Sequence, residues 1–366
     1  MAEKFLRIAL VGAATLLGKA LNDELSDSAF ATADFHLMDE EDAIGKLAAA
    51  ADEATFIQRI EPDSFDGCDF TFFAGHPDIT KKHWRQALKA GSSIVDLSGA
   101  LEDAPDTMVR APWIQEERAA MGAPQIAPSD VVAPNLQTRA VVSAHPVAVL
   151  LALLAARSQR VSPLHGVWAT LLQPASEYGH AALEELHQQT TNLLSFQPLP
   201  TEVFGDQTAF NLAISFGAEG RVKLDAASEI IRRHYAKIAS VPTATLALQV
   251  IQVPVFHGYA LSIAVEFEQP VAIGVLEQAL AGTHVRIVAH ASEFPGNVQA
   301  VEEDDVQILV QPALANTFLS GKQSAGDRKT SRFWLWVVAD NLKFASQNAV
   351  ACAAELNRLR PRGKVQ

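Results

Sequence analysis

Apolar residues in the first half of the chain form short runs separated by amphipathic stretches. Residues 5–11 are mostly apolar, end before a glycine and are too few for a helix, which predicts a buried parallel strand. The same reasoning predicts strands at 34–38, 69–74 and 93–97, with helices at 18–25 and 84–90. Strands and helices in this rhythm indicate right-handed crossovers and a doubly wound parallel sheet, in which ligands bind at the carboxyl ends of the strands.

Polar and apolar residues alternate in parts of the second half, most clearly at 259–268, as in an antiparallel strand with one exposed face. Further strands are predicted at 166–172, 249–254, 284–289, 307–311 and 332–339, with helices at 180–194, 226–239 and 341–359. This pattern is typical of an α+β domain with a mixed sheet. The predicted domains are therefore a Rossmann-like, dinucleotide-binding domain at 1–147 with 340–366, onto which the last helix packs back, and an α+β domain at 148–339.

Composition narrows the possible partners and the compartment. The chain has 366 residues, 49% of them hydrophobic, and a formal net charge of −13, which suits a globular protein that binds neither nucleic acid nor an anionic membrane. Its two cysteines favour a reducing compartment over a disulfide framework. No apolar run approaches the length of a membrane span, and the N-terminus lacks the layout of a signal peptide. A cytoplasmic location is expected.

The segment Gly12-Ala-Ala-Thr-Leu-Leu-Gly18 joins the first predicted strand to the first predicted helix. Glycines at such a turn let backbone N–H groups approach a pyrophosphate at a helix N-terminus. Only the first and last glycines of the usual pattern are present, so this segment alone leaves a purely structural turn equally open. The residues predicted to line a nucleotide site are Gly12, Ala13, Thr15, Leu16, Leu17 and Gly18, together with Gly75 and Ser98 from later in the chain.

Six segments follow one family's motifs in order and spacing. The glycine turn corresponds to Gly-Ala-Thr-Gly-x-Val-Gly. The other five segments are Phe72-Phe-Ala-Gly-His76, Ile94-Val-Asp-Leu-Ser-Gly-Ala-Leu101, Thr208-Ala-Phe-Asn211, Gln252-Val-Pro-Val255 and Val338-Ala-Asp-Asn-Leu342. In these segments the chain resembles the aspartate-semialdehyde dehydrogenases along nearly its whole length. The resemblance implies a homodimer whose second domain supplies most of the interface and the active-site residues.

The resemblance also implies a reaction that depends on a cysteine. Enzymes of this family interconvert an acyl phosphate and an aldehyde through a cysteine thioester, with a histidine moving protons and a nicotinamide exchanging hydride. A thiolate is needed because it combines nucleophilicity with leaving ability near neutral pH. The family's Ala-Asn-Pro-Asn-Cys corresponds to Ala144-His-Pro-Val-Ala148, which puts Ala148 at the nucleophile position. Cys68 and Cys352 lie far from it in the sequence and are predicted to be buried structural side chains.

Other positions of the family's site differ as well. Tyr259 takes the place of the base histidine, and a phenol with a pKa near ~10 is a poor base at neutral pH. Gln252 stands where the family has a substrate arginine, and Glu102 replaces the phosphate arginine with a negative charge. Gln173 matches a retained glutamine and is given no catalytic role. No metal site is predicted.

These losses together favour a non-catalytic dimeric homologue, a pseudoenzyme, similar to the Usg-type branch of the family. Two alternatives stay open. One is an NAD(P)-dependent oxidoreductase acting on another small carbonyl compound, with Tyr259 or His145 as proton donor. The other is a scaffold or regulatory partner of an active paralogue.

The cofactor expectation depends on two departures from the family pattern. Thr15 replaces the middle glycine of the turn, where a branched side chain would crowd a phosphate. The Asp-Glu-Glu-Asp stretch at 39–42 replaces the family's reader of the 2′-phosphate and is interpreted as a solvated acidic loop. NAD or an empty site is therefore expected rather than NADP.

Overall fold

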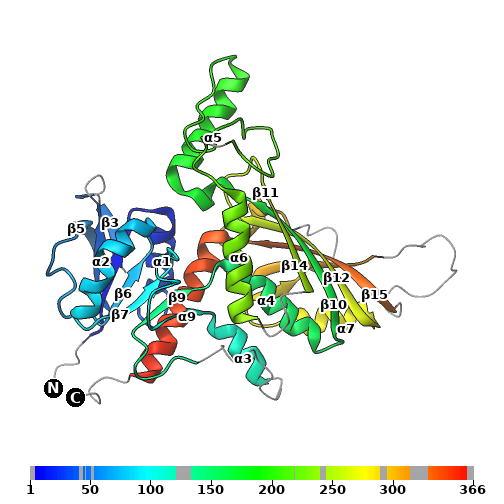
Figure 1. The fold of residues 1–366 in the computed structure, drawn as a ribbon, viewed down its shortest axis with the longest axis horizontal. Helices are drawn as coiled ribbons and strands as arrows, with labels where there is room; N and C mark the ends of the chain where they lie inside the picture. Colours follow the sequence, from blue (N-terminus) through cyan, green and yellow to red (C-terminus); the bar gives the residue numbers. More distant parts are fainter. Residues whose placement is uncertain are drawn as a thin grey trace. The chain divides into compact units, whose positions relative to one another are not determined.

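The chain divides into two compact units (Figure 1). Unit 1 comprises Met1–Glu116, Gln125–Pro146 and Leu342–Gln366, and unit 2 comprises Glu117–Pro124 and Val147–Asn341. The computed structural model describes residues 5–40, 44–45, 47–50, 53–120, 133–217, 219–239, 245–288, 295–313 and 329–360.

Unit 1 is built on a seven-stranded sheet in the order β5-β2-β1-β6-β7-β9-β8, in which every strand pairing is parallel. Its strands are β1 (Arg7–Val11), β2 (Asp34–Asp39), β5 (Gln58–Arg59), β6 (Phe70–Phe73), β7 (Ser93–Asp96), β8 (Thr107–Arg110) and β9 (Ala140–Ser143), and β3 (Leu47–Ala50) and β4 (Glu53–Phe56) form a separate hairpin. Its helices are α1 (Leu16–Ser26), α2 (Pro77–Lys89), α3 (Pro112–Ala120, which runs into unit 2) and α9 (Asn341–Leu359).

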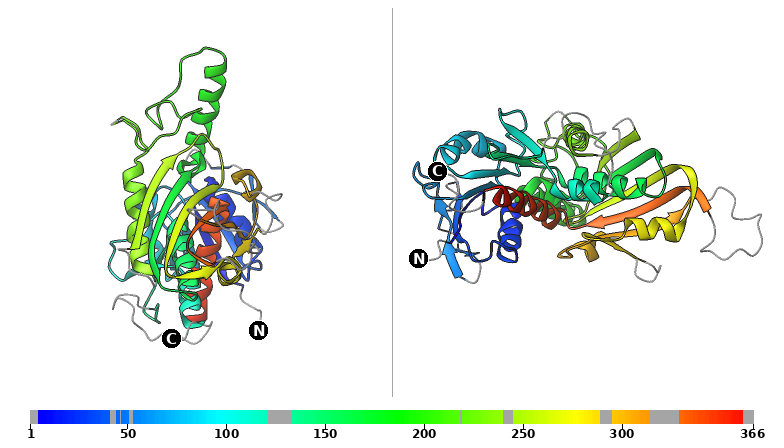
Figure 2. Two further views of the ribbon diagram at one scale, coloured as in Figure 1. Left: turned by 90° about the vertical axis from the view of Figure 1, so that its right-hand side faces the viewer. Right: turned by 90° about the horizontal axis from the view of Figure 1, so that it is seen from below.

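Helices cover both faces of the unit 1 sheet. Leu21 of α1 and Cys352 of α9 share one buried cluster with the sheet, and α1 (blue) and α9 (red) lie side by side in Figure 2. Trp84 of α2 belongs to a second cluster on the opposite face. The chain moves from β1 to β2 on one side and later to β6 on the other, so the strand order reverses at β1. The carboxyl end of β1 is therefore the point where doubly wound folds bind ligands.

Unit 2 is built on a six-stranded mixed sheet in the order β11-β10-β12-β15-β14-β13. Its strands are β10 (Leu164–Gln173), β11 (Leu246–Gln252), β12 (Tyr259–Ala272), β13 (Val285–Ile287), β14 (Val306–Pro312) and β15 (Lys329–Ala339). Its helices are α4 (Pro146–Gln159), the 3₁₀ turn η2 (Ala175–Tyr178), α5 (Gly179–Leu194), α6 (Leu224–Ile238), α7 (Ile273–Leu280) and α8 (Asn297–Ala300). The pair β10–β11 is parallel, so the carboxyl ends of these two strands meet.

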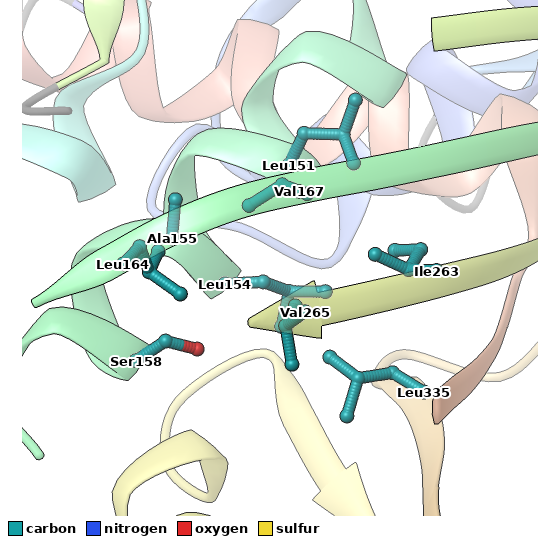
Figure 3. Close-up of a pocket in the computed structure, with 9 residues that line it drawn as sticks. All are labelled: Leu151, Leu154, Ala155, Ser158, Leu164, Val167, Ile263, Val265 and Leu335. Atoms are coloured by element: carbon teal, nitrogen blue, oxygen red, sulfur yellow. The ribbon is translucent and has the colours of Figure 1, made fainter. Parts of the chain in front are cut away.

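Helix α4 is buried along nearly its whole length and packs under the unit 2 sheet. Figure 3 shows Leu151 and Leu154 of α4 facing Ile263 and Val265 of β12 and Leu335 of β15 around a small apolar pocket. A helix without a polar face suits this position, because both sides of it must be kept from water. The segment belongs to the long apolar stretch 141–156, which the structure divides between β9 and α4 at Pro146.

The predicted fold class is confirmed, and the differences lie in individual elements. The helix predicted at 84–90 begins at Pro77, because His76 caps its first turn and Pro77 and Asp78 are favourable at a helix start. The sequence pattern gave no sign of β3, β4, β5 or β8, which are short. Within the described residues, no helix is both long and apolar enough to cross a membrane.

Candidate functional site

The glycine turn of unit 1 lies at the carboxyl end of β1. The N–H groups of Gly12 and Ala13 both donate to the carbonyl oxygen of Met38, at 2.9 and 3.2 Å. Gly12 has a φ of +87°, and a Cβ atom there would lie 2.4 Å from the backbone nitrogen of Gly75. A Cβ on Gly18 would lie 2.0 Å from the Gly12 carbonyl oxygen. Backbone packing therefore requires both glycines, whether or not a nucleotide binds.

Thr15, which the motif resemblance aligns with the family's middle glycine, is the N-cap of α1. Its hydroxyl oxygen accepts a hydrogen bond from the Gly18 N–H at 2.8 Å and lies within bonding distance of the carbonyl oxygens of Gly12 and Ala74. The threonine thus occupies one N–H that an anion at this turn would use. The first two helix residues, Leu16 and Leu17, have no intrahelical acceptor for their N–H groups, so a pyrophosphate would meet these two groups.

Asp39 ends β2 beside this turn. One of its carboxylate oxygens accepts a hydrogen bond from the Ala14 N–H and the other from the Glu40 N–H, both at 2.8 Å. Asp39 is only 8% exposed. The interpretation of 39–42 as a solvated loop is therefore wrong for Asp39, because the turn shields its carboxylate. Glu40 is exposed as expected, and residues 41–42 lie outside the described residues.

The two later residues predicted for the nucleotide site have different surroundings. Gly75 lies directly against Gly12, so it belongs to the same edge of the sheet. The hydroxyl of Ser98 donates to the fully buried carboxylate of Asp96 at 2.6 Å and lies 2.9 Å from the Thr80 hydroxyl. Burial raises the pKa of Asp96, and the Ser98 hydrogen bond opposes that shift. Ser98 is therefore engaged in the turn after β7.

A second group of predicted residues meets in unit 2, where β10 and β11 end. Gln173 and Gln252 are register partners on the two strands. The Gln252 amide nitrogen donates to the carbonyl oxygens of Gln173 and Val253, at 3.0 and 3.1 Å. Gln252 is fully buried, and its amide oxygen has no hydrogen-bond partner among the described residues. Gln252, which the motif resemblance aligns with a substrate arginine, thus holds two strand ends together.

Tyr259, at the start of β12, lies near the same strand ends. Its hydroxyl donates to a carboxylate oxygen of Glu177 at 2.5 Å, and the side chain is 1% exposed. Burial raises the pKa of Tyr259 well above its ordinary value, and the negative charge of Glu177 raises it further. The Gln173 amide nitrogen donates to the hydroxyl of Tyr178 at 2.7 Å. The phenol is thus neutral and engaged, and has no basic character near neutral pH.

Asn341 completes this group and was not singled out from the sequence. Its amide oxygen accepts hydrogen bonds from the Ser176 hydroxyl and from the Gly258 N–H, both at 3.1 Å. Because Gly258 N–H can only donate, the orientation of the amide is fixed. Asn341 belongs to the matched segment 338–342, which was its one signal in the sequence. Glu177 was also missed, because it lies four positions after Gln173 and outside every motif that was matched to the family.

Ala148, which the motif resemblance assigns to the nucleophile position, is fully buried in the first turn of α4, and its side chain is a methyl group. Both cysteines belong to unit 1 and are buried, as predicted. Burial raises the pKa of the Cys68 thiol to about 11 and that of the Cys352 thiol further. Neither thiol is a thiolate near neutral pH, so neither is a ready nucleophile.

Two further residues have the following surroundings. Glu102 is half-buried in the loop after β7, in unit 1. His257, the residue before Gly258, is half-buried, and its carbonyl oxygen accepts a hydrogen bond from the Asn297 amide at 3.3 Å. Among the described residues, no group of three or more His, Cys, Asp or Glu side chains could hold a metal ion.

Family models match both parts of the chain. The model of the semialdehyde dehydrogenase NAD binding domain matches residues 7–132, and that of the semialdehyde dehydrogenase dimerisation domain matches residues 155–316. The first match supports the expectation of a nicotinamide nucleotide in unit 1. The second identifies the interface-forming part of the family within unit 2.

Whole-chain relatives agree with these matches. A USG-1 protein homolog from Pseudomonas aeruginosa is 31% identical over 351 residues, which cover 94% of this chain and 96% of the relative. A probable aspartate-semialdehyde dehydrogenase from the same species has a similar structure, with a TM-score of 0.75, 26% identity and coverage of 99% of this chain and 100% of that chain. The structure of aspartate semialdehyde dehydrogenase II from Vibrio cholerae in complex with ASA shares the fold, with a TM-score of 0.78, 21% identity and coverage of 97% and 99%. The chain therefore belongs to the aspartate-semialdehyde dehydrogenase family, in its Usg-like branch.

Proposed function

We propose that this chain is a dimeric, nucleotide-binding family member that does not carry out the family's thioester reaction. The observation that carries the proposal is Ala148 at the nucleophile position, because a methyl group forms no acyl intermediate. The two thiols of the chain do not substitute for it, since burial keeps Cys68 and Cys352 protonated near neutral pH.

The side chains around the strand ends of unit 2 support the same proposal. The Gln252 amide nitrogen donates to strand backbone, and the Tyr259 hydroxyl donates to Glu177. Within this group of Gln173, Glu177, Gln252, Tyr259 and Asn341, the one charged side chain is negative. A phosphate or a substrate carboxylate approaching it would meet repulsion in place of a guanidinium.

A turnover assay tests the proposal. The purified protein is incubated with aspartate semialdehyde, phosphate and either NAD or NADP, and formation of the reduced nicotinamide is followed, with an active family enzyme as positive control. We expect no formation above the blank. The Ala148→Cys variant should stay inactive as well, because the base and the substrate arginine are still missing. Turnover by the unmodified protein would overturn the proposal.

The alternative of an oxidoreductase on another carbonyl has less support. If Tyr259 were the proton donor, its phenol would have to release a proton, but the phenol is buried, its pKa is raised and its hydrogen is already bonded to Glu177. His145 is half-buried and remains a predicted donor only. The scaffold or regulatory role beside an active paralogue and the cytoplasmic location also stay predictions.

The homodimer part of the proposal is supported by the sheet of unit 2. Trp168 on β10 and Trp334 on β15 both pair with Ala264 on β12, so the three side chains share one row on one face. The two indoles are 47% and 48% exposed, within or close to the matched dimerisation domain. Large exposed aromatics of this kind are typical of interfaces. Sedimentation velocity should give a dimer that dissociates in Trp168→Glu, and a monomeric unmodified protein would contradict this part.

A further inference from the structure

Asp39 gives the nucleotide turn a feature that the match to the NAD binding domain does not describe. We propose that Asp39 makes this site select NAD over NADP by accepting a hydrogen bond from the unphosphorylated ribose. The proposal concerns binding alone, so it holds whether or not the chain turns over any substrate.

The backbone places Asp39 at the position from which doubly wound folds bind the adenosine ribose. β1 and β2 are parallel and in register, with Val11 opposite Met38, so the residue after Met38 lies beside the start of the glycine turn. The carbonyl oxygen of Met38 accepts from both Gly12 and Ala13, which fixes the turn to the end of β2. In doubly wound folds, an acidic residue about 20 residues beyond the turn binds the ribose 2′-hydroxyl.

The hydrogen bonds of Asp39 hold its carboxylate in place for this role. Ala14 and Glu40 each donate a backbone N–H to a different carboxylate oxygen, at 2.8 Å. Each oxygen keeps a further lone pair, so a ribose hydroxyl can still donate to it. A 2′-phosphate in the same place would bring a second negative charge against a carboxylate that is 8% exposed and little screened by water.

Arg59 is the alternative candidate for the residue that determines the choice between NAD and NADP. It pairs with Asp39 in the parallel register of β2 and β5, and a guanidinium near this strand end could accept a 2′-phosphate. However, Arg59 is exposed on β5, an edge strand of two residues, whereas Asp39 is buried and bonded directly to the turn. The rigidly held carboxylate is therefore favoured over the exposed guanidinium as the determinant.

Calorimetric titration of the full chain with NAD and with NADP tests the proposal. We expect NAD to bind at least about tenfold more tightly, as a charged hydrogen bond in place of a charge repulsion implies. Asp39→Asn removes the charge but keeps an oxygen for the Ala14 N–H, and it should bring the two affinities within about threefold of each other. Glu40→Gln is the matched control, because it removes the same charge from an exposed neighbour, and it should leave the ratio unchanged. Arg59→Gln should also leave the ratio unchanged.

Several results would overturn the proposal. Equal or tighter binding of NADP by the unmodified protein would do so, as would the absence of binding of either nucleotide at millimolar concentration. An unchanged ratio in a folded Asp39→Asn variant would remove Asp39 as the determinant, and a selective loss of NADP affinity in Arg59→Gln would assign the reading to Arg59. If Asp39→Asn does not fold, the ratio for the unmodified protein and the Glu40→Gln and Arg59→Gln arms still decide.

Discussion

The two sheet ends that the family resemblance marks as functional differ in how their polar groups are used. At the glycine turn of unit 1, the backbone form is kept, because Gly12 and Gly18 are demanded by close contacts within the turn itself. At the ends of β10 and β11 in unit 2, the Gln252 amide nitrogen and the Tyr259 hydroxyl donate to the protein's own groups. A site that binds through backbone N–H groups tolerates substitution, whereas a site that reacts through side chains loses its chemistry with them.

The largest expected loss of stability tests the glycine turn of unit 1. Gly12→Ala should lower the free energy of unfolding by about 3 kcal/mol or more, because it combines a left-handed φ with a Cβ placed 2.4 Å from Gly75 nitrogen. Gly91→Ala is the control, since Gly91 has a φ of +93° and nothing within 4 Å of a Cβ. Its loss should be about 1–2 kcal/mol in the same urea titration. Equal losses in the two variants would mean that the close approach to Gly75 costs nothing.

A smaller expected loss of stability tests the strand ends of unit 2. Asn341→Ala should lower the free energy of unfolding by about 2 kcal/mol, because it leaves the Gly258 N–H and the Ser176 hydroxyl buried without their acceptor. Asn211→Ala, at an exposed asparagine, should cost less than about 0.5 kcal/mol. If Asn341→Ala were as mild as this control in urea unfolding, the strand-end network would not be a stabilising one.

The sequence correctly predicted those strands and helices whose formation depends on the local pattern of apolar and polar residues. The strand before the glycine turn follows from a short apolar run, and helix α9 was predicted with its observed bounds, Asn341–Leu359. The start of α2 was missed because its first turns are polar, and helical periodicity appears only once Trp84 is reached. Local pattern could not show the network around Asn341, because Gly258 lies 83 positions away along the chain.

The same limit explains Asp39. An acidic run of four residues is usually solvated, and composition gives no reason to treat its first member differently. Asp39 differs because parallel pairing of β1 and β2 sets it beside the Ala14 N–H, 25 positions earlier. The positions of Ala148, Gln252 and Tyr259 were inferred from motif order, and the structure adds what each side chain contacts.

The central claim is that this protein has no thiolate ready to form a thioester, and thiol alkylation tests it most directly. The native protein is treated with iodoacetamide over a series of pH values, and Cys68 and Cys352 are followed separately by mass spectrometry, with the urea-unfolded protein as control. A raised pKa means that the thiol stays protonated at neutral pH, and its thiolate fraction grows only as the pH rises toward about 11 for Cys68 and beyond that for Cys352. We therefore expect both thiols to react far more slowly than in the unfolded chain at neutral pH, with Cys68 accelerating first in alkali. Alkylation of either thiol in the native protein at neutral pH, as fast as in the unfolded chain, would contradict the claim.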